Sequence, residues 1–298
     1  MTASGTASIS SENRAAGILW MLATMFCFIA LDAIMKYLME SYSLLQVTWG
    51  RFFFATIIAV FVCGRRLPSL AISRSPGLQA VRSVLLMTTT GLFNAGIRTV
   101  PLAATTTIMF LSPILVTVLS IPLLKEKVGM RRWAGVLVGF AGAAIVVRPW
   151  DSNLGGLGIG VLFLLAAALT NANYQIVTRM VRNDEQLTSL LYTAAAGAIA
   201  TSFVVPWFWS WPDAMGWTLL ASSGLFGGIG HLCLIKALQQ APASVVAPFS
   251  YSSLIWATLF GLAIWGEWPD EWTWAGAALI IGSGLYIFHR ERVRHADT

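Results

Sequence analysis

The chain alternates long apolar segments with short polar connections. A helix that crosses a bilayer needs about 20 mostly apolar residues, and a series of such segments runs through the whole sequence. We expect ten transmembrane helices, over residues 16–37, 44–63, 79–98, 103–123, 132–148, 156–178, 187–208, 215–235, 243–265 and 273–289. The pattern therefore predicts an all-α membrane protein without an inserted soluble domain.

The composition indicates the same class. Of the 298 residues, 57% are hydrophobic and only 11% are charged, and the mean hydropathy is +0.72, whereas a soluble domain carries about 25% charged residues. A net charge of +6 in a soluble protein would suggest nucleic acid. Here the arginines lie in short connections rather than in one patch, so we expect a lipid bilayer and no nucleic acid as partner.

The reactive residue types form no enzyme or metal pattern. Cys27, Cys63 and Cys233 lie in apolar segments without ligand spacing, so we expect neither a disulfide nor a metal site. The sequence has no HExxH, no GxSxG and no glycine-rich phosphate loop. We expect no cofactor and no catalytic residue.

The basic residues predict the orientation, because cytoplasmic loops carry an excess of Lys and Arg. With both termini cytoplasmic, most of the 19 basic residues fall on the inner side. This favours a multi-pass protein of a bacterial-type inner membrane. Residues 1–15 are expected to form a disordered leader and residues 290–298 a basic cytoplasmic tail.

The two halves of the sequence are related. Residues 100–135, "VPLAATTTIMFLSPILVTVLSIPLLKEKVGMRRWAG", align without a gap to residues 241–276, so that Glu126 matches Glu267 at an offset of 267 − 126 = 141. We predict two five-helix repeats, over residues 16–148 and 156–289, joined by an outer linker at 149–155. An odd number of helices inverts the second repeat in the membrane, which is typical of secondary transporters with a site near the midplane.

These motifs resemble a known family. "VPLAA…LLKEK…WAGVLVGFAGAAIVV" and "APASV…IWGEW…WAGAALIIGSGLYIF" are similar to the EamA-type unit of the drug/metabolite transporter superfamily. The resemblance covers nearly the whole chain and implies transport of small metabolites. Length and aromatic content further resemble the YddG-like amino-acid exporters, which implies export of aromatic and other apolar amino acids, and in some cases of drug-like cations.

The repeat offset also selects candidate residues for the substrate path. Thr90 corresponds to His231 and Phe110 to Tyr251, so polar or aromatic groups recur at related positions. For Thr90 and His231 a structural hydrogen bond inside the bundle is the alternative. The candidates are Thr90, Asn94, Phe110, Ser112, Asn173, Tyr174, His231, Ser250 and Tyr251.

Two prolines interrupt the fourth and ninth predicted helices. Pro113 and Pro248 each remove one backbone hydrogen bond, so they predict hinges. The fourth and ninth helices would then form a moving pair that lines the path. A static kink is the alternative.

Three charges lie in the outer third of the first two helices. Asp32 has two candidate partners, Lys36 one turn away and Arg51 on the next helix. Because intramembrane charges are normally paired, we expect an Asp32–Arg51 pair that is either structural or part of an outer gate. Glu267 lies at a helix end, where we expect it to cap the following helix.

The expected path contains few charges, since only Arg51 lies deep in a span. A zwitterion with an apolar side chain fits such a path best. Nucleotide sugars and other phosphorylated metabolites, which need several cationic residues, are the alternative, as are cationic drugs. The glycine-rich fifth and tenth helices predict close helix packing and a homodimer face.

Overall fold

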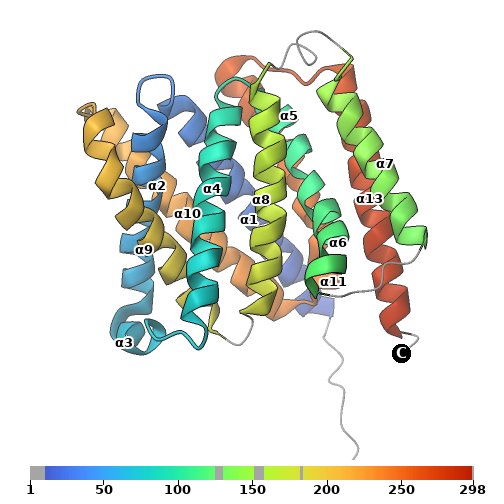
Figure 1. The fold of residues 1–298 in the computed structure, drawn as a ribbon, viewed down its shortest axis with the longest axis horizontal. Helices are drawn as coiled ribbons and strands as arrows, with labels where there is room; N and C mark the ends of the chain where they lie inside the picture. Colours follow the sequence, from blue (N-terminus) through green and yellow to red (C-terminus); the bar gives the residue numbers. More distant parts are fainter. Residues whose placement is uncertain (1–10, 125–129, 151–157, 182–183, 297–298) are drawn as a thin grey trace, which may run out of the picture.

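The structure is a computed structural model that describes residues 11–124, 130–150, 158–181 and 184–296. All its regular elements in these ranges are helical (Figure 1). The first half contains α1 (Ser11–Leu38), α2 (Leu44–Cys63), η1 (Gly64–Arg66), α3 (Leu67–Leu70), α4 (Pro76–Ile97), α5 (Leu102–Met109), α6 (Leu111–Leu124) and α7 (Met130–Val147). The second contains α8 (Gly160–Met180), α9 (Gln186–Val204), η2 (Val205–Phe208), α10 (Ala214–Gln240), α11 (Ala243–Val246), η3 (Ala247–Ser252), α12 (Ser253–Phe260), η4 (Gly261–Trp265) and α13 (Glu271–Ala296).

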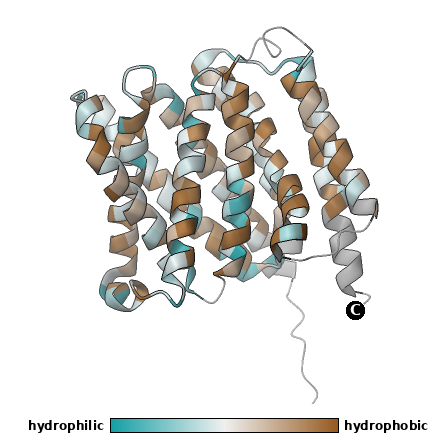
Figure 2. Cartoon of the chain, viewed as in Figure 1, coloured by the Kyte–Doolittle hydropathy of each residue, from teal (hydrophilic) through white to brown (hydrophobic). Residues whose placement is uncertain are grey.

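The predicted class, an all-α membrane protein, is confirmed. Seven helical segments among the described residues are long and apolar enough to cross a membrane, and a shorter apolar helix covers Trp133–Val147. Large apolar side chains such as Phe61 and Phe203 point outward, where lipid covers them. Figure 2 shows hydrophobic residues along most of the helices. The segments predicted at 79–98 and 273–289 lie in α4 and α13, outside the seven, so the count of ten crossings stays a prediction.

The helices of the two halves pack in a reciprocal pattern. α1 of the first half packs along α10 of the second, and the helices at the related positions, α8 and α4, pack along each other. The related pairs α2 with α9 and α7 with α13 also pack together. The amino end of α1 and the carboxyl end of α13 lie at the same end of the bundle, below in Figure 1. We call this the lower end and the opposite one the upper end.

The glycine-rich helices α7 and α13 pack against each other within the chain. A Cβ atom built on Gly142 would lie 2.9 Å from the carbonyl oxygen of Gly276 and 2.9 Å from the side chain of Ile280. The predicted close packing is therefore present, but inside one chain. Because these glycines face their own bundle, they no longer argue for a homodimer face.

The backbone is irregular close to both predicted hinge prolines. The helix breaks at Phe110, between α5 and α6, three residues before Pro113. Pro248 lies in η3, a 3₁₀ turn that precedes α12. Missing N–H groups explain both interruptions. A hinge motion at these two points remains a prediction.

Candidate functional site

A cavity of about 530 Å³ lies between helices of the two halves. This volume is in the range of small-molecule sites, about 300–1,000 Å³. The first half contributes residues from α1, α2 and α4, and the second half residues from α8, α9 and α10. The lining residues include the apolar Phe28, Phe52, Ala55, Leu86, Leu190, Ala194 and Leu234 and the polar or charged Arg51, Arg82, Tyr174, Thr178, Thr193 and His231.

The cavity runs from the middle of the bundle to its lower end. Arg51 is seven residues after the start of α2, about 10 Å from the upper end of that helix. At the other extreme the lining includes Asp184, in the connection between α8 and α9, and Gln186 at the start of α9. The cavity thus reaches the end that the sequence predicts to be cytoplasmic.

Arg82 is buried at the wall of this cavity and joins α4 to two helices of the other half. Its Nε donates to Thr178 Oγ1 at 2.9 Å and its Nη2 to Tyr174 Oη at 2.6 Å, both on α8. Nη1 donates to the Ser189 carbonyl at 2.8 Å and to Thr193 Oγ1, both on α9. All four acceptors are neutral, so the guanidinium is well solvated by the protein while its positive charge is not neutralised by them.

Asp32 and Arg51 do not form the expected ion pair. Among the described residues, the structure gives Asp32 no hydrogen-bond or ion-pair partner. Arg51 makes one long contact, from Nη1 to the Met35 sulfur at 3.9 Å, and lies 5.9 Å from the Phe52 ring. Both charged residues are half-buried rather than sealed in the core.

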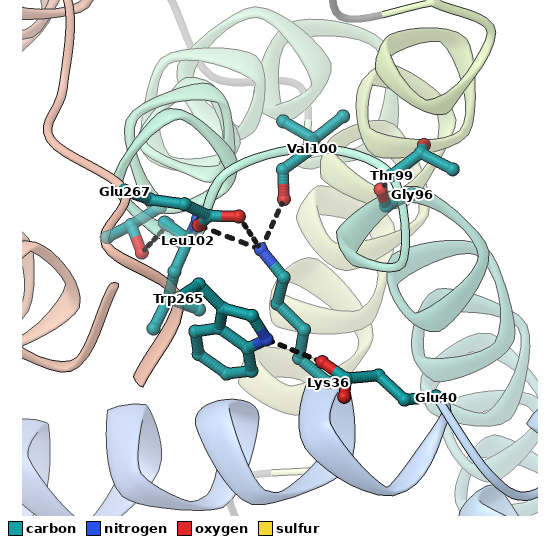
Figure 3. Close-up of polar contacts among 9 residues, drawn as sticks. Lys36, Glu40, Gly96, Thr99, Val100, Leu102, Trp265 and Glu267 are labelled. Carbon is teal, nitrogen blue, oxygen red and sulfur yellow. Dashed lines mark hydrogen bonds and ion pairs between the residues drawn. The ribbon is translucent and has the colours of Figure 1, made fainter. Parts of the chain in front are cut away.

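Lys36 is also not a partner of Asp32. Its Nζ binds both carboxylate oxygens of Glu267, at 2.7 and 2.8 Å, and donates to the Val100 carbonyl at 3.3 Å (Figure 3). The Lys36 side chain is only 7% exposed. Glu267 in turn accepts from the backbone N–H of Leu102 at 3.2 Å. Glu267 therefore caps α5, not the following helix α13, and it ties the second half to α1 at the upper end.

The local chain explains how Glu267 reaches this position. Gly266 has a left-handed backbone conformation, φ +67°, which ends η4 and turns the chain. Trp265, just before it, lies against the Lys36 ammonium at 4.7 Å and donates from Nε1 to Glu40 at 2.6 Å (Figure 3). The turn at Gly266 thus places the Glu267 carboxylate against the buried ammonium group of Lys36.

Further contacts close the upper end. Gln46 exchanges two hydrogen bonds with Ser210, at 2.7 and 2.9 Å. The Tyr42 hydroxyl donates a hydrogen bond to Asp213 at 3.2 Å. An apolar cluster lies below these contacts. The fully buried members of this cluster include Leu31, Met35, Leu38, Val47, Ile97, Leu102 and Leu220. The cavity is therefore separated from the upper surface by packed side chains.

Hydrogen bonds also order the loops at the lower end. Asp184 accepts from Ser73 Oγ at 2.5 Å, from the Arg74 N–H at 2.9 Å and from Gln79 Nε2 at 2.9 Å. Burial acts to raise the pKa of the Asp184 carboxyl, but these hydrogen bonds and the Arg74 charge hold that pKa below its ordinary value. The carboxylate thus links the chain before α4 to the chain before α9, at the edge of the cavity.

Of the sequence-predicted residues, the structure brings Arg51, Tyr174 and His231 to the same cavity. The His231 Nδ1 donates to the Gly227 carbonyl at 2.8 Å, and the ring lies edge-on to Phe28 with centroids 5.1 Å apart. One nitrogen of His231 is therefore used within its own helix, which leaves Nε2 as its remaining polar atom.

The other predicted residues lie elsewhere, and α6 and α12 do not line this cavity. Pro113, Pro248, Ser250 and Tyr251 line a second cavity of about 220 Å³ between α6, α8, η3 and α13. Phe110 packs edge-on against Tyr251 with ring centroids 5.0 Å apart. Helices α6 and α12 are thus absent from the larger cavity among the described residues, and a path lined by the fourth and ninth predicted helices stays a prediction.

Three more candidates make contacts between or within helices, and a fourth is buried. Asn94 donates to Thr48 Oγ1 at 2.8 Å, and Ser112 donates to the Ala168 carbonyl at 3.1 Å. Asn173 donates to the Leu169 carbonyl of its own helix at 2.9 Å. Thr90 is buried on α4 outside both cavities.

The sequence interpretation missed Arg82, and with it Thr178 and Thr193. Arg82 lies inside the predicted segment 79–98, but the sequence interpretation places only Arg51 deep in a span. That position was the available signal, because a charge within a span normally faces the bundle interior. The statement that only Arg51 lies deep in a span is corrected: two arginines line the cavity.

Comparisons with known proteins agree with this architecture. The sequence profile of the EamA-like transporter family matches the chain twice, over residues 15–148 and 158–288. The chain belongs to this family. Its relatives place it among multi-pass proteins of bacterial inner membranes that transport small metabolites.

Two relatives illustrate the range of the family. The S-adenosylmethionine uptake transporter of Rickettsia prowazekii is 28% identical over 278 residues, 93% of each chain. The riboflavin transporter of Vibrio cholerae is 28% identical over 279 residues, 91% of this chain and 92% of the relative. A solved crystal structure of a protein with 16% identity superposes with a TM-score of 0.66 over 95% of this chain and 99% of the other, which shows a common fold.

Proposed function

We propose that this chain is a secondary or facilitative transporter of a small amphipathic metabolite that contains a planar ring. The observation that carries the proposal is the cavity of about 530 Å³, which combines Arg51, Arg82, Tyr174 and His231 with an apolar wall. Convergent polar groups in an otherwise apolar pocket are typical of sites for small organic ligands. The printed names of the two relatives, for S-adenosylmethionine and riboflavin, agree with a ring-bearing substrate of this size.

The transport mechanism follows from the two halves. We propose that residues 16–148 and 156–289 are inverted repeats with cytoplasmic termini, that the cavity lies between them, and that they alternate its access. The cavity reaches the lower end while paired charges and packed side chains close the upper end. Opening the upper end would require separation of Lys36 from Glu267.

Substrate and direction are proposed as follows. Aromatic amino acids, the substrates expected from the sequence, have the right chemistry but would leave part of the cavity empty. Larger conjugates with a heteroaromatic ring fill it better. The relatives' names favour uptake over the expected export. Two arginines in the wall argue against cationic drugs that lack an anionic group, since like charges repel, whereas the carboxylate of S-adenosylmethionine could pair with an arginine despite the sulfonium charge.

Counterflow in proteoliposomes tests this proposal. The purified protein is reconstituted, the vesicles are loaded in turn with S-adenosylmethionine, riboflavin, L-phenylalanine or a nucleotide sugar, and exchange with the same radiolabelled compound is measured. We expect saturable exchange of at least one of the first three. Exchange of the nucleotide sugar alone, or of none of the four, would overturn the proposal.

A matched pair of variants shows whether the cavity carries the substrate. Ala55→Trp places a large ring at the cavity wall and should abolish exchange, because it fills the space that the substrate needs. Ala141→Trp makes the same change on an exposed face of α7 and should leave exchange intact. Equal activity of the two variants would place the route elsewhere.

A further inference from the structure

Asp32 and Arg51 are opposite charges on neighbouring helices that attract each other at longer range, but neither makes an ion-pair contact among the described residues. A charge within a membrane span is costly unless it is paired or serves a function. The nearby Lys36 is paired with Glu267, and Arg82 has four neutral hydrogen-bond acceptors. In the part of the chain that the structure describes, Asp32 and Arg51 therefore both retain the capacity to bind a further charged group.

Arg51 lies at the upper, inner end of the cavity, and Asp32 lies at a similar depth on α1, next to the cavity-lining residues but not among them. Arg51 lines the cavity directly. Phe28, Asp32 and Met35 are spaced i, i+4 and i+7 on α1, so they share one helix face. Phe28 lines the cavity and Met35 contacts the Arg51 guanidinium. Asp32 lies between them on this face of α1, about one turn above Phe28 and about one turn below Met35.

Resting on the function proposed above, we infer that Asp32 and Arg51 bind the two charges of an α-amino-acid headgroup. The guanidinium of Arg51 receives the carboxylate, for which its planar fork of donors is suited. The Asp32 carboxylate receives the ammonium group. The substrate class is therefore zwitterionic: amino acids, and conjugates in which an amino-acid headgroup is joined to a larger ring.

The remainder of such a substrate has a suitable environment below the headgroup. Phe28 and Phe52 present aromatic rings, and Leu86 and Leu190 present aliphatic side chains to the same cavity. A ring that packs among them is removed from water, while Tyr174 and His231 offer polar atoms at its edge. A zwitterion thus places both charges at one end of the site and its apolar group at the other.

The test uses purified protein in proteoliposomes and compounds that differ in one charge. Radiolabelled L-phenylalanine is competed with unlabelled L-phenylalanine, with 3-phenylpropionate, which lacks the amine, and with phenethylamine, which lacks the carboxylate. Radiolabelled S-adenosylmethionine is competed with S-adenosylhomocysteine, which keeps the headgroup but lacks the sulfonium charge, and with methylthioadenosine, which lacks both. We expect each loss of a headgroup charge to weaken competition about tenfold to a hundredfold, as for hydrogen bonds to charged groups.

Two variants then assign each charge to its residue. Arg51→Gln should remove the preference for phenylalanine over phenethylamine, and Asp32→Asn the preference for phenylalanine over 3-phenylpropionate. Arg98→Gln and Glu271→Gln, the same changes at exposed positions, should alter neither preference. A purely structural pair would give lower thermal stability in both variants with the two preferences unchanged.

The outcomes separate this inference from the proposed function. Riboflavin exchange without competition by either headgroup-bearing probe would retain the transporter and overturn the zwitterion site. Retained preferences in folded Asp32→Asn and Arg51→Gln proteins would also overturn it. Exchange of none of the ring-bearing compounds would overturn the proposed function first.

Discussion

Charged side chains inside the bundle have different kinds of partner at its two ends. At the upper end Lys36, Glu267 and the backbone groups of Val100 and Leu102 satisfy one another, and little of the lysine is exposed. In the cavity that leads to the lower end, Arg51 has no acidic partner among the described residues. The buried lysine at the upper end is thus ion-paired, whereas the cavity arginine Arg51 makes no ion-pair contact in the described part of the chain, as the proposed substrate site requires.

This difference in charge pairing is also a departure from the similarity of the two repeats. The repeat offset places Val177 at the position that corresponds to Lys36, since 36 + 141 = 177. A lysine–glutamate pair of the kind seen at the upper end therefore has no counterpart with the same residues at the lower end. If the two halves alternate as proposed, they would otherwise favour both closures equally, and we therefore propose that this pair favours closure at the upper end.

The largest expected effect comes from removing the acidic partner. Glu267→Gln leaves the Lys36 ammonium in a buried site with only neutral acceptors. Loss of one member of a buried pair costs about 3–5 kcal/mol, and we expect about 3 kcal/mol because Glu267 remains 27% exposed. Thermal unfolding in detergent should show a clearly lower midpoint.

Two further variants control this measurement. Glu271→Gln makes the same change at an exposed position and should leave the midpoint within experimental error. Lys36→Met combined with Glu267→Gln removes both charges and should recover most of the lost stability. If Glu267→Gln unfolds at the same temperature as Glu271→Gln, the pair does not hold the upper end.

A smaller effect is expected from one hydrogen bond across the halves. Tyr174→Phe removes one of the four acceptors of the buried Arg82 guanidinium, so we expect a loss of about 1.5 kcal/mol in unfolding free energy. Tyr192→Phe is the matched control, because its hydroxyl donates to the Ala71 carbonyl at an exposed position. Equal losses in the two variants would show that the Arg82 contacts add nothing to stability.

The fold was predictable because the signal for a membrane helix is local. The predicted segment 44–63 coincides with α2, and the fourth predicted helix covers α5 and α6. Even the irregular backbone near Pro113 and Pro248 was indicated, since a missing N–H acts within one turn. What each helix packs against was not visible, and the small residues of α7 and α13 therefore suggested a dimer instead of an internal contact.

The site was less predictable because its contacts join distant parts of the sequence. Lys36 had an acid one turn away, but its partner is 231 residues further along the chain. The repeat relation pointed to Glu267 because it matches Glu126, which lies outside the described residues. The relation did not indicate which cationic side chain Glu267 would bind. In the sequence Arg82 resembles a loop arginine, and its acceptors on α8 and α9 are visible only in the structure.

The smallest expected effect concerns the loops at the lower end and depends on pH. Because hydrogen bonds hold the pKa of Asp184 below its ordinary value, about 3.9, ionised Asp184 contributes stability that is fully present above that pH. The contribution is lost as the pH falls through the lower, folded-state value.

Wild-type protein should therefore lose lower-end order below about pH 4, which hydrogen exchange at Arg74 would report. Asp184→Asn should show faster exchange at Arg74 at neutral pH and little further change in acid, whereas Glu185→Gln, at an exposed ion pair, should follow the wild type. Equal acid dependence in wild type and Asp184→Asn would mean that the lower end does not depend on this carboxylate.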